Sequence, residues 1–131
     1  MNKYFAFSSG GAYHFQGGGE WKMRADDDGN LSVEHDIFGA VTRFGPFQLS
    51  EDESAALWDL IAGAAFEQRT LPPGPGMPEE SLLGFALSAQ ESLLNVQLWT
   101  SQALQDTPIL ALLDGIGALI EKYTGKKPEL H

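Results

Sequence analysis

Cysteine is absent from the 131-residue sequence, which excludes a disulfide framework, a thiolate nucleophile and zinc–thiolate ligation. Long apolar runs are absent too, and none approaches the roughly 20 residues that a membrane-spanning helix needs. No basic segment followed by a long apolar segment opens the sequence, so we expect a cytoplasmic protein. Any chemistry would have to come from carboxylates, hydroxyls or the three histidines.

Basic residues are scarce, since eight lysines and arginines stand against 18 aspartates and glutamates, giving a net charge of −10. The excess is confined to residues 51–121, which hold eleven acids and one base, Arg69, whereas the rest of the chain holds seven of each. Such a surface repels the phosphates of nucleic acids and anionic lipids. We therefore expect no nucleic-acid or membrane partner, while a basic protein would be attracted. Solubility is the alternative reason for the charge.

Length and patterning predict a single α+β domain spanning residues 1–131. Short alternating patterns fill the first 48 residues and return at 82–99, whereas helical patterns fill 49–66 and 107–124. We expect an antiparallel sheet, made of a five-stranded meander and a later hairpin, with two helices packed on one face.

Four glycine-containing turns set the predicted register of the meander, because residues opposite one another in an antiparallel pair share a face. The turns are Ser9–Gly11, Gly17–Gly19, Asp27–Gly29 and Gly39–Ala40. The predicted pairs are Phe7 with Tyr13, Phe5 with Phe15, Tyr13 with Met23, Phe15 with Trp21, Met23 with Val33, Trp21 with His35, His35 with Phe44, and Asp36 with Arg43. One face of the meander is then aromatic and packs on the helices, and the other is charged.

The first helix is predicted to start at Ser50, which forms a capping box with Glu53, and to bury Leu57, Leu60, Ile61 and Ala64. The last helix is predicted to start at Thr107 as N-cap, with Pro108 at the first helical position, and to end at Gly125. Gly115 and Gly117 lie inside that helix, where each glycine costs about 1 kcal/mol relative to alanine. We therefore expect a close approach of this helix to the sheet or to the first helix.

Both sides of the hairpin at 82–99 carry apolar residues, whereas a sheet with one solvated face would have one polar side. Leu83, Phe85 and Leu87 face the core, yet the other side pairs Leu82 with Trp99 and also carries Leu93. Leu82, Leu93 and Trp99 are therefore a candidate interaction patch. The alternative is that the proline-rich stretch Arg69–Pro78, expected as a loop, or the C-terminal tail covers them.

His35 is the titratable residue predicted on the aromatic face, between Trp21 and Phe44. If the helices leave space above it, these three residues line a ligand pocket with His35 as a contact or general base. The alternative is a buried histidine bonded to a polar neighbour. No carboxylate or serine is placed to complete a nucleophilic triad with it.

Two other motifs are better explained as turns. Asp26-Asp27-Asp28-Gly29-Asn30 lacks the glycine and glutamate spacing of a calcium-binding EF-hand loop. The glycine clusters at 10–11 and 17–19 are not followed by a lysine and a helix, as a phosphate-binding loop would be. We predict no metal and no cofactor.

These observations favour a non-catalytic, cytoplasmic protein-interaction module for a basic protein partner, such as an inhibitor, an immunity protein or a chaperone. The size and acidity resemble those of small secretion chaperones and immunity proteins, a similarity of composition. Two other classes remain open: a small-molecule-binding domain or enzyme with the pocket at His35, and a self-associating structural protein, for example a homodimer.

Overall fold

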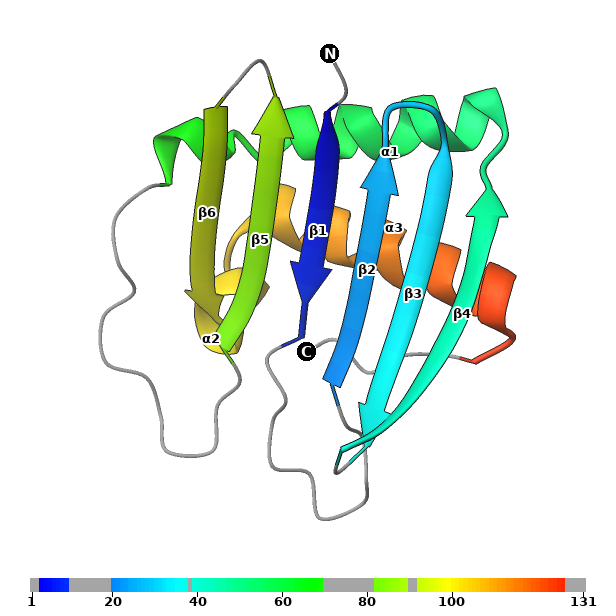
Figure 1. Ribbon diagram of the computed structural model, residues 1–131. Helices are drawn as coiled ribbons and strands as arrows, with labels where there is room; N and C mark the ends of the chain where they lie inside the picture. The colour runs from blue at the N-terminus through cyan, green and yellow to red at the C-terminus, as the bar shows by residue number, and fades with distance from the viewer. Residues whose placement is uncertain (1–2, 10–19, 38, 70–81, 90–91, 127–131) are drawn as a thin grey trace.

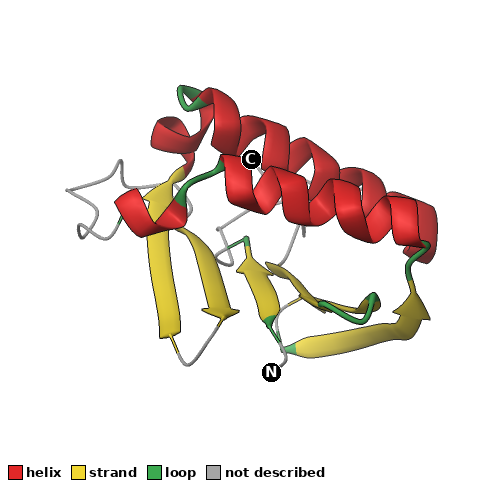
Figure 2. Ribbon diagram, turned by 90° about the horizontal axis from the view of Figure 1, so that it is seen from above, coloured by secondary structure: helices red, strands yellow, loops and turns green. Residues whose placement is uncertain are grey.

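The computed structural model describes residues 3–9, 20–37, 39–69, 82–89 and 92–126. Its six strands form one antiparallel sheet, and its two long helices lie across one face of that sheet (Figures 1 and 2). The predicted α+β class is confirmed. In chain order the elements are β1 (Tyr4–Ser8), β2 (Glu20–Asp26), β3 (Asn30–Ile37), β4 (Ala40–Gln48), α1 (Glu51–Gly63), the 3-10 helix η1 (Phe66–Gln68), β5 (Leu82–Ala89), β6 (Ser92–Trp99), α2 (Thr100–Leu104) and α3 (Thr107–Thr124).

The first strand lies in the middle of the sheet, whose order is β4-β3-β2-β1-β5-β6. Phe7 of β1 is opposite Met23 of β2 on one side and Phe85 of β5 on the other. The predicted pairing of Phe7 with Tyr13 is therefore wrong, because both sides of β1 are occupied. Within the described residues the meander has four strands, and the strand expected around Tyr13 and Phe15 lies outside them.

The β2–β3 register agrees with the sequence. Trp21 is opposite His35, Met23 is opposite Val33, and Asp27–Gly29 connects the two strands. All three features follow from a short turn that ends on glycine.

The β3–β4 register differs from the prediction by two residues, since His35 is opposite Thr42 and Arg43 is opposite Glu34. Gly39, with φ +88°, takes the second position of the turn from Ile37 to Ala40, and its N–H donates to Asp36 Oδ1 at 2.8 Å. The predicted pairs of His35 with Phe44 and of Asp36 with Arg43 are therefore wrong. A shift of two residues preserves the faces, so His35 and Phe44 still share the helix-covered side.

The two edge strands differ in regularity. In β4 the register to β3 shifts between Leu31 and Val33, so that Gly45 and Pro46 form a bulge. A Cβ at Gly45 would lie 2.9 Å from the Leu31 carbonyl oxygen, and φ there is +97°, so the position requires glycine. On the other edge, β6 pairs regularly with β5, and the predicted register with Leu82 opposite Trp99 is confirmed.

The start of α1 is confirmed. Ser50 Oγ accepts from the Glu53 N–H at 3.1 Å, and Glu53 Oε1 accepts from the Ser50 N–H at 3.0 Å. Of the predicted core positions in this segment, Leu57, Ile61 and Ala64 are buried and Leu60 is half-buried.

The start of α3 is one residue from the prediction. Asp106 is the N-cap and its Oδ1 accepts from the Ile109 N–H at 3.4 Å, so the assignment of Thr107 as N-cap is wrong. The carboxylate of Asp106 also forms a two-pronged ion pair with Arg69, which fixes it at the helix start. The C-terminal prediction is confirmed, since Gly125 caps the helix with φ +74°. The five-residue helix α2 was not predicted.

The two long helices meet closely. A Cβ at Gly115 of α3 would lie 2.5 Å from Leu60 Cδ1 of α1, which confirms the expected close approach. Glu53 at the start of α1 accepts from Lys122 and Tyr123 at the end of α3. The helices cover a core that includes Phe5, Phe7, Leu31, Phe66, Leu83 and Ile116. Among the described helices, none is at once long enough and apolar enough to cross a membrane.

Candidate functional site

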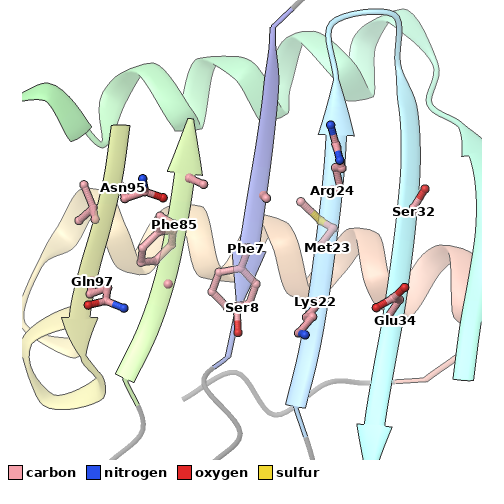
Figure 3. Close-up of a pocket in the computed structure, with 14 residues that line it drawn as sticks. Phe7, Ser8, Lys22, Met23, Arg24, Ser32, Glu34, Phe85, Asn95 and Gln97 are labelled. Carbon is pink, nitrogen blue, oxygen red and sulfur yellow. The ribbon is translucent and has the colours of Figure 1, made fainter. Parts of the chain in front are cut away.

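The sheet face opposite the helices is hollowed over the neighbouring strands β1 and β5 and the strands beside them (Figure 3). On this face two successive β1–β5 pairs have short side chains, with Ala6 opposite Ala86 and Ser8 opposite Gly84, whereas the next pair places the large Tyr4 opposite Ser88. We call the hollow over the four residues of the two short pairs the β1–β5 trough. The whole pocket, which also extends over Ser32 and Glu34 of β3, has a volume of about 670 Å³, within the roughly 300–1,000 Å³ typical of ligand-binding sites.

Longer side chains on the neighbouring strands form the walls of the trough (Figure 3). Arg24 and Lys22 of β2 stand opposite Ala6 and Ser8 on one side. Asn95 and Gln97 of β6 stand on the other side, opposite Ala86 and Gly84. All four are exposed. The walls therefore offer two cations on one side and two carboxamides on the other.

The core fixes the floor from below. Alternation in β1 sends Phe5 and Phe7 to the helix side and Ala6 and Ser8 to the open side. The rings of Phe7 and Phe85 lie 5.4 Å apart, and both are buried directly under the trough. The short side chains on the open face are thus held by a packed aromatic layer, so the trough is a fixed feature of the sheet.

The charges around the trough are mostly paired. Lys22 Nζ lies 3.8 Å from Glu20 Oε1, and Ser8 Oγ donates to the same oxygen at 2.6 Å. Arg43 Nε lies 3.2 Å from Glu34 Oε1.

Arg24 differs from the other cations of this face because its guanidinium lies 4.2 Å from the ring centre of Tyr4. Within the described part of the chain no carboxylate lies at ion-pair distance from Arg24. Arg24 is therefore the wall residue best placed to receive a carboxylate or carbonyl oxygen from a bound molecule.

The trough presents both apolar and polar groups to the solvent. Its lining combines aliphatic and aromatic carbon with amide, hydroxyl, ammonium, guanidinium and carboxylate groups. No histidine is among the described lining residues, and the Ser8 hydroxyl is already bonded to a carboxylate. These groups can hold an apolar surface and bond to its polar edges.

The residues predicted around His35 do come together, on the opposite face of the sheet. The rings of Trp21 and His35 stack with centroids 3.8 Å apart and planes 7° apart, and Phe44 lies 6.4 Å from Trp21. Trp21 is only 3% exposed. The three rings therefore pack on one another, and the trough lies on the other side of the sheet. A ligand contact at His35 stays a prediction.

The predicted patch is split between the two ends of the trough. Leu82 and Trp99 are opposite one another and half-buried at one end. Leu93 is opposite Ser88 at the other end and is 57% exposed. Leu93 and Trp99 are six positions apart in β6, a distance of about 20 Å in a strand. The three residues do not form one contiguous cluster, and their role in interaction stays a prediction.

The acidic turn brings the carboxylates of Asp26, Asp27 and Asp28 within 4.8 Å of one another. Both carboxylate oxygens of Asp26 accept hydrogen bonds from its own loop. Oδ1 accepts from the N–H groups of Asp28 and Asn30, and Oδ2 accepts from Asn30 Nδ2, each at 3.0 Å. These bonds fit a side chain that stabilises a turn. Calcium independence remains a prediction.

The helical layer carries a second feature, an acidic outer surface. Exposed acids on it are Glu51, Asp52, Asp59, Asp114 and Glu121. Among the described residues the open sheet face mixes cations and anions, so the negative excess of these residues lies on the helical layer.

The trough residues were missed at the level of sequence. The signal was the alternation of short side chains in Ala6-Phe7-Ser8 and in Gly84-Phe85-Ala86. Each tripeptide alone looks like an ordinary strand, and only the pairing of β1 with β5 brings the two together. No protein-family model matches the chain and no curated protein is significantly similar to it, so its function has to be inferred from this geometry.

Proposed function

We propose that the protein is a non-catalytic protein-interaction module that holds a segment of a basic partner protein in the β1–β5 trough. The observation that carries the proposal is the pocket of about 670 Å³ on an open sheet face, whose floor includes Ala6, Ser8, Gly84 and Ala86. The backbones of β2 and β6, which bear the walls, are three strand spacings apart, about 14 Å. That width admits one extended segment or one face of a helix.

The basic nature of the partner is supported by charge. A chain with a net charge of −10 attracts a basic protein from a distance and raises its rate of encounter. Short-range recognition then belongs to the trough, where Asn95 and Gln97 bond to polar groups of the segment and Arg24 receives an oxygen atom. A cytoplasmic location, expected from the sequence, is part of this proposal.

The test is to fill the trough without unfolding the protein. A Cβ at Gly84 would lie 3.8 Å from Ser8 Cβ, an ordinary contact, and glycine is a poor strand residue, so Gly84→Leu should fold. Gly63→Leu adds the same side chain on the helical layer, where a Cβ meets nothing within 4 Å, and serves as the matched control. All three proteins are immobilised and exposed to lysate of the cell that makes the protein, and retained molecules are identified by mass spectrometry.

We expect the wild type and Gly63→Leu to retain a basic protein from the lysate. In a titration with that purified partner, the affinity of Gly84→Leu should be about tenfold or more lower than that of the wild type. Binding should weaken between about 0.1 and 1 M salt, because the Debye length falls from about 10 to about 3 Å. Equal affinity of Gly84→Leu and wild type would place the site elsewhere. A small molecule retained by wild type, in place of a protein, would favour the small-molecule-binding alternative.

A further inference from the structure

The edge strand β6 belongs to a run of the sequence that carries no charge. From Ser92 to Gln105 there are fourteen residues without Asp, Glu, Lys or Arg, in a chain in which 20% of residues are charged. The run contains β6 and α2. Leu93 and Leu104 within it are 57% and 46% exposed, and among the described residues only Val41 is a further exposed large apolar side chain. This part of the surface is therefore neutral and partly apolar.

The other edge strand, β4, has features that keep the edges of natural sheets from pairing with strands of other molecules. In β4 the bulge at Gly45 and Pro46 breaks the regular pattern, Pro46 has no N–H, and Arg43 adds an exposed charge. None of these devices is present in β6, which is eight residues long and pairs with β5 in regular register. A regular, uncharged edge strand is a template for pairing with another strand.

The backbone groups that β6 offers can be deduced from its hairpin. Ala89 is paired with Ser92 across two residues, and a two-residue hairpin loop is closed by a hydrogen-bonded pair. Hydrogen-bonded and non-bonded pairs alternate along an antiparallel ladder. The N–H and C=O groups of Leu93, Asn95 and Gln97 therefore point away from β5, and no described strand lies on that side.

We propose that β6 pairs with β6 of a second copy of this chain, antiparallel about a two-fold axis near Asn95, to make a continuous twelve-stranded sheet. The net charge of the chain is the reason to propose a second copy as the partner of β6. Two chains of net charge −10 repel, so a close contact is favoured where each chain is neutral, and the Ser92–Gln105 run supplies such a surface at an edge of the described sheet. A two-fold axis brings the same neutral strand from both chains together, so one surface satisfies both partners. This inference does not depend on the proposed function of the trough.

The test places a lysine on each edge in turn. Asn95→Lys puts two like charges face to face at the proposed axis, whereas Thr42→Lys makes a similar polar-to-lysine change at an exposed position of β4. Sedimentation equilibrium gives the mass in solution for comparison with the chain mass of 14.2 kDa. We expect twice the chain mass for wild type and Thr42→Lys, and dimerisation weakened at least tenfold, about 1.4 kcal/mol, for Asn95→Lys.

Two further measurements make the result specific. Asn95→Pro removes an outward N–H and should also give the monomer, with circular dichroism to verify that it folds. Gly84→Leu, which blocks the trough, should keep the dimer mass. Failure of the β6 pairing would therefore be seen in the solution mass, and failure of the proposed function in the titration of the partner. A wild-type monomer from micromolar to millimolar concentration would overturn the proposal, as would a dimer that Asn95→Lys and Asn95→Pro leave intact or that Thr42→Lys dissociates equally.

Discussion

Glu53 is the residue through which the ends of the two long helices are joined. Its carboxylate accepts hydrogen bonds from Lys122, from the Tyr123 hydroxyl and from the Ser50 N–H. These donors, Lys122 first, lower the pKa of Glu53 to about 2. The folded state therefore favours the ionised carboxylate more strongly than the unfolded chain does, where the pKa of a glutamate is about 4.3.

The low pKa of Glu53 predicts how stability depends on pH. The contribution of this carboxylate is complete above about pH 4.3 and is lost as the pH falls toward 2, because protonation removes the acceptor. Glu53→Gln should lower the urea midpoint at pH 6. Midpoints measured at intervals of about one pH unit should show that the difference from wild type shrinks between pH 4.5 and pH 2. Glu51→Gln, exposed on the same turn, is the control and should show no such convergence. Parallel curves for wild type and Glu53→Gln would contradict this role.

The aspartate cluster of the β2–β3 turn leads to a second prediction at this scale. Because Asp26 directs both of its oxygens to its own loop, a cation would have to compete with three existing hydrogen bonds. We therefore expect that millimolar calcium does not bind the turn and leaves the melting temperature unchanged. A ligand that binds only the folded state would raise the melting temperature. A rise of several degrees that disappears in Asp28→Ala would show that the turn binds the ion.

Gly115 of α3 lies against Leu60 of α1, so that an added side chain there would have to displace the Leu60 methyl group. Alanine there would gain up to about 1 kcal/mol of helix propensity, but its Cβ would lie 2.5 Å from Leu60 Cδ1. Gly115→Ala should therefore gain clearly less than this amount in wild type and the full amount in a Leu60→Ala background. Urea denaturation of the four proteins of this double-mutant cycle measures the coupling, which we expect to be about 0.5 kcal/mol or more. Additive free energies would mean that the two residues do not constrain one another.

Elements whose signals lie close together in the chain were predictable. The Ser50–Glu53 capping box, the Gly125 cap, the Asp27–Gly29 turn and the hairpin at 82–99 each depend on residues within one hairpin or one helical turn. The β3–β4 turn was misassigned because glycine suits either central position of a two-residue turn, and Asp36 decides between them by binding the Gly39 N–H. Asp106 was missed as N-cap, although aspartate is a preferred N-cap residue, because Pro108 was assigned to the first helical position and occupies the second.

The trough was not foreseen for a different reason. The sequence indicates which face of each strand is apolar, and Trp21 and His35 do share a face as expected. Which strands are neighbours is a property of the whole sheet, and the pairing of Ala6 with Ala86 joins two distant parts of the chain. A hollow whose floor is made of short side chains becomes visible only after that pairing is known.

Across the whole molecule, the net charge of −10 predicts a dependence of stability on salt. The exposed acids of α1 and α3 repel one another, and salt shortens the range of that repulsion from about 30 Å at 0.01 M to about 10 Å at 0.1 M. The melting temperature should therefore rise with sodium chloride over this range. Asp59→Lys, which reverses one charge of this surface, should reduce the rise. A melting temperature that is constant or falls with salt would show that repulsion within the folded chain is unimportant.

The central place of β1 in the sheet has a consequence for how the chain is made. Ser8 pairs with Gly84 and Tyr4 with Ser88, so β1 and β5 are joined by contacts 76 to 84 residues apart. At a synthesis rate of about 5–20 residues per second, β1 leaves the ribosome on the order of ten seconds before β5. During that interval β2 can cover one side of β1, while the other side is an open strand edge exposed to neighbouring nascent chains. Mispairing of this protein should therefore be concentrated in its synthesis, and slowing translation between residues 9 and 82 should increase aggregation more than the same delay after residue 89.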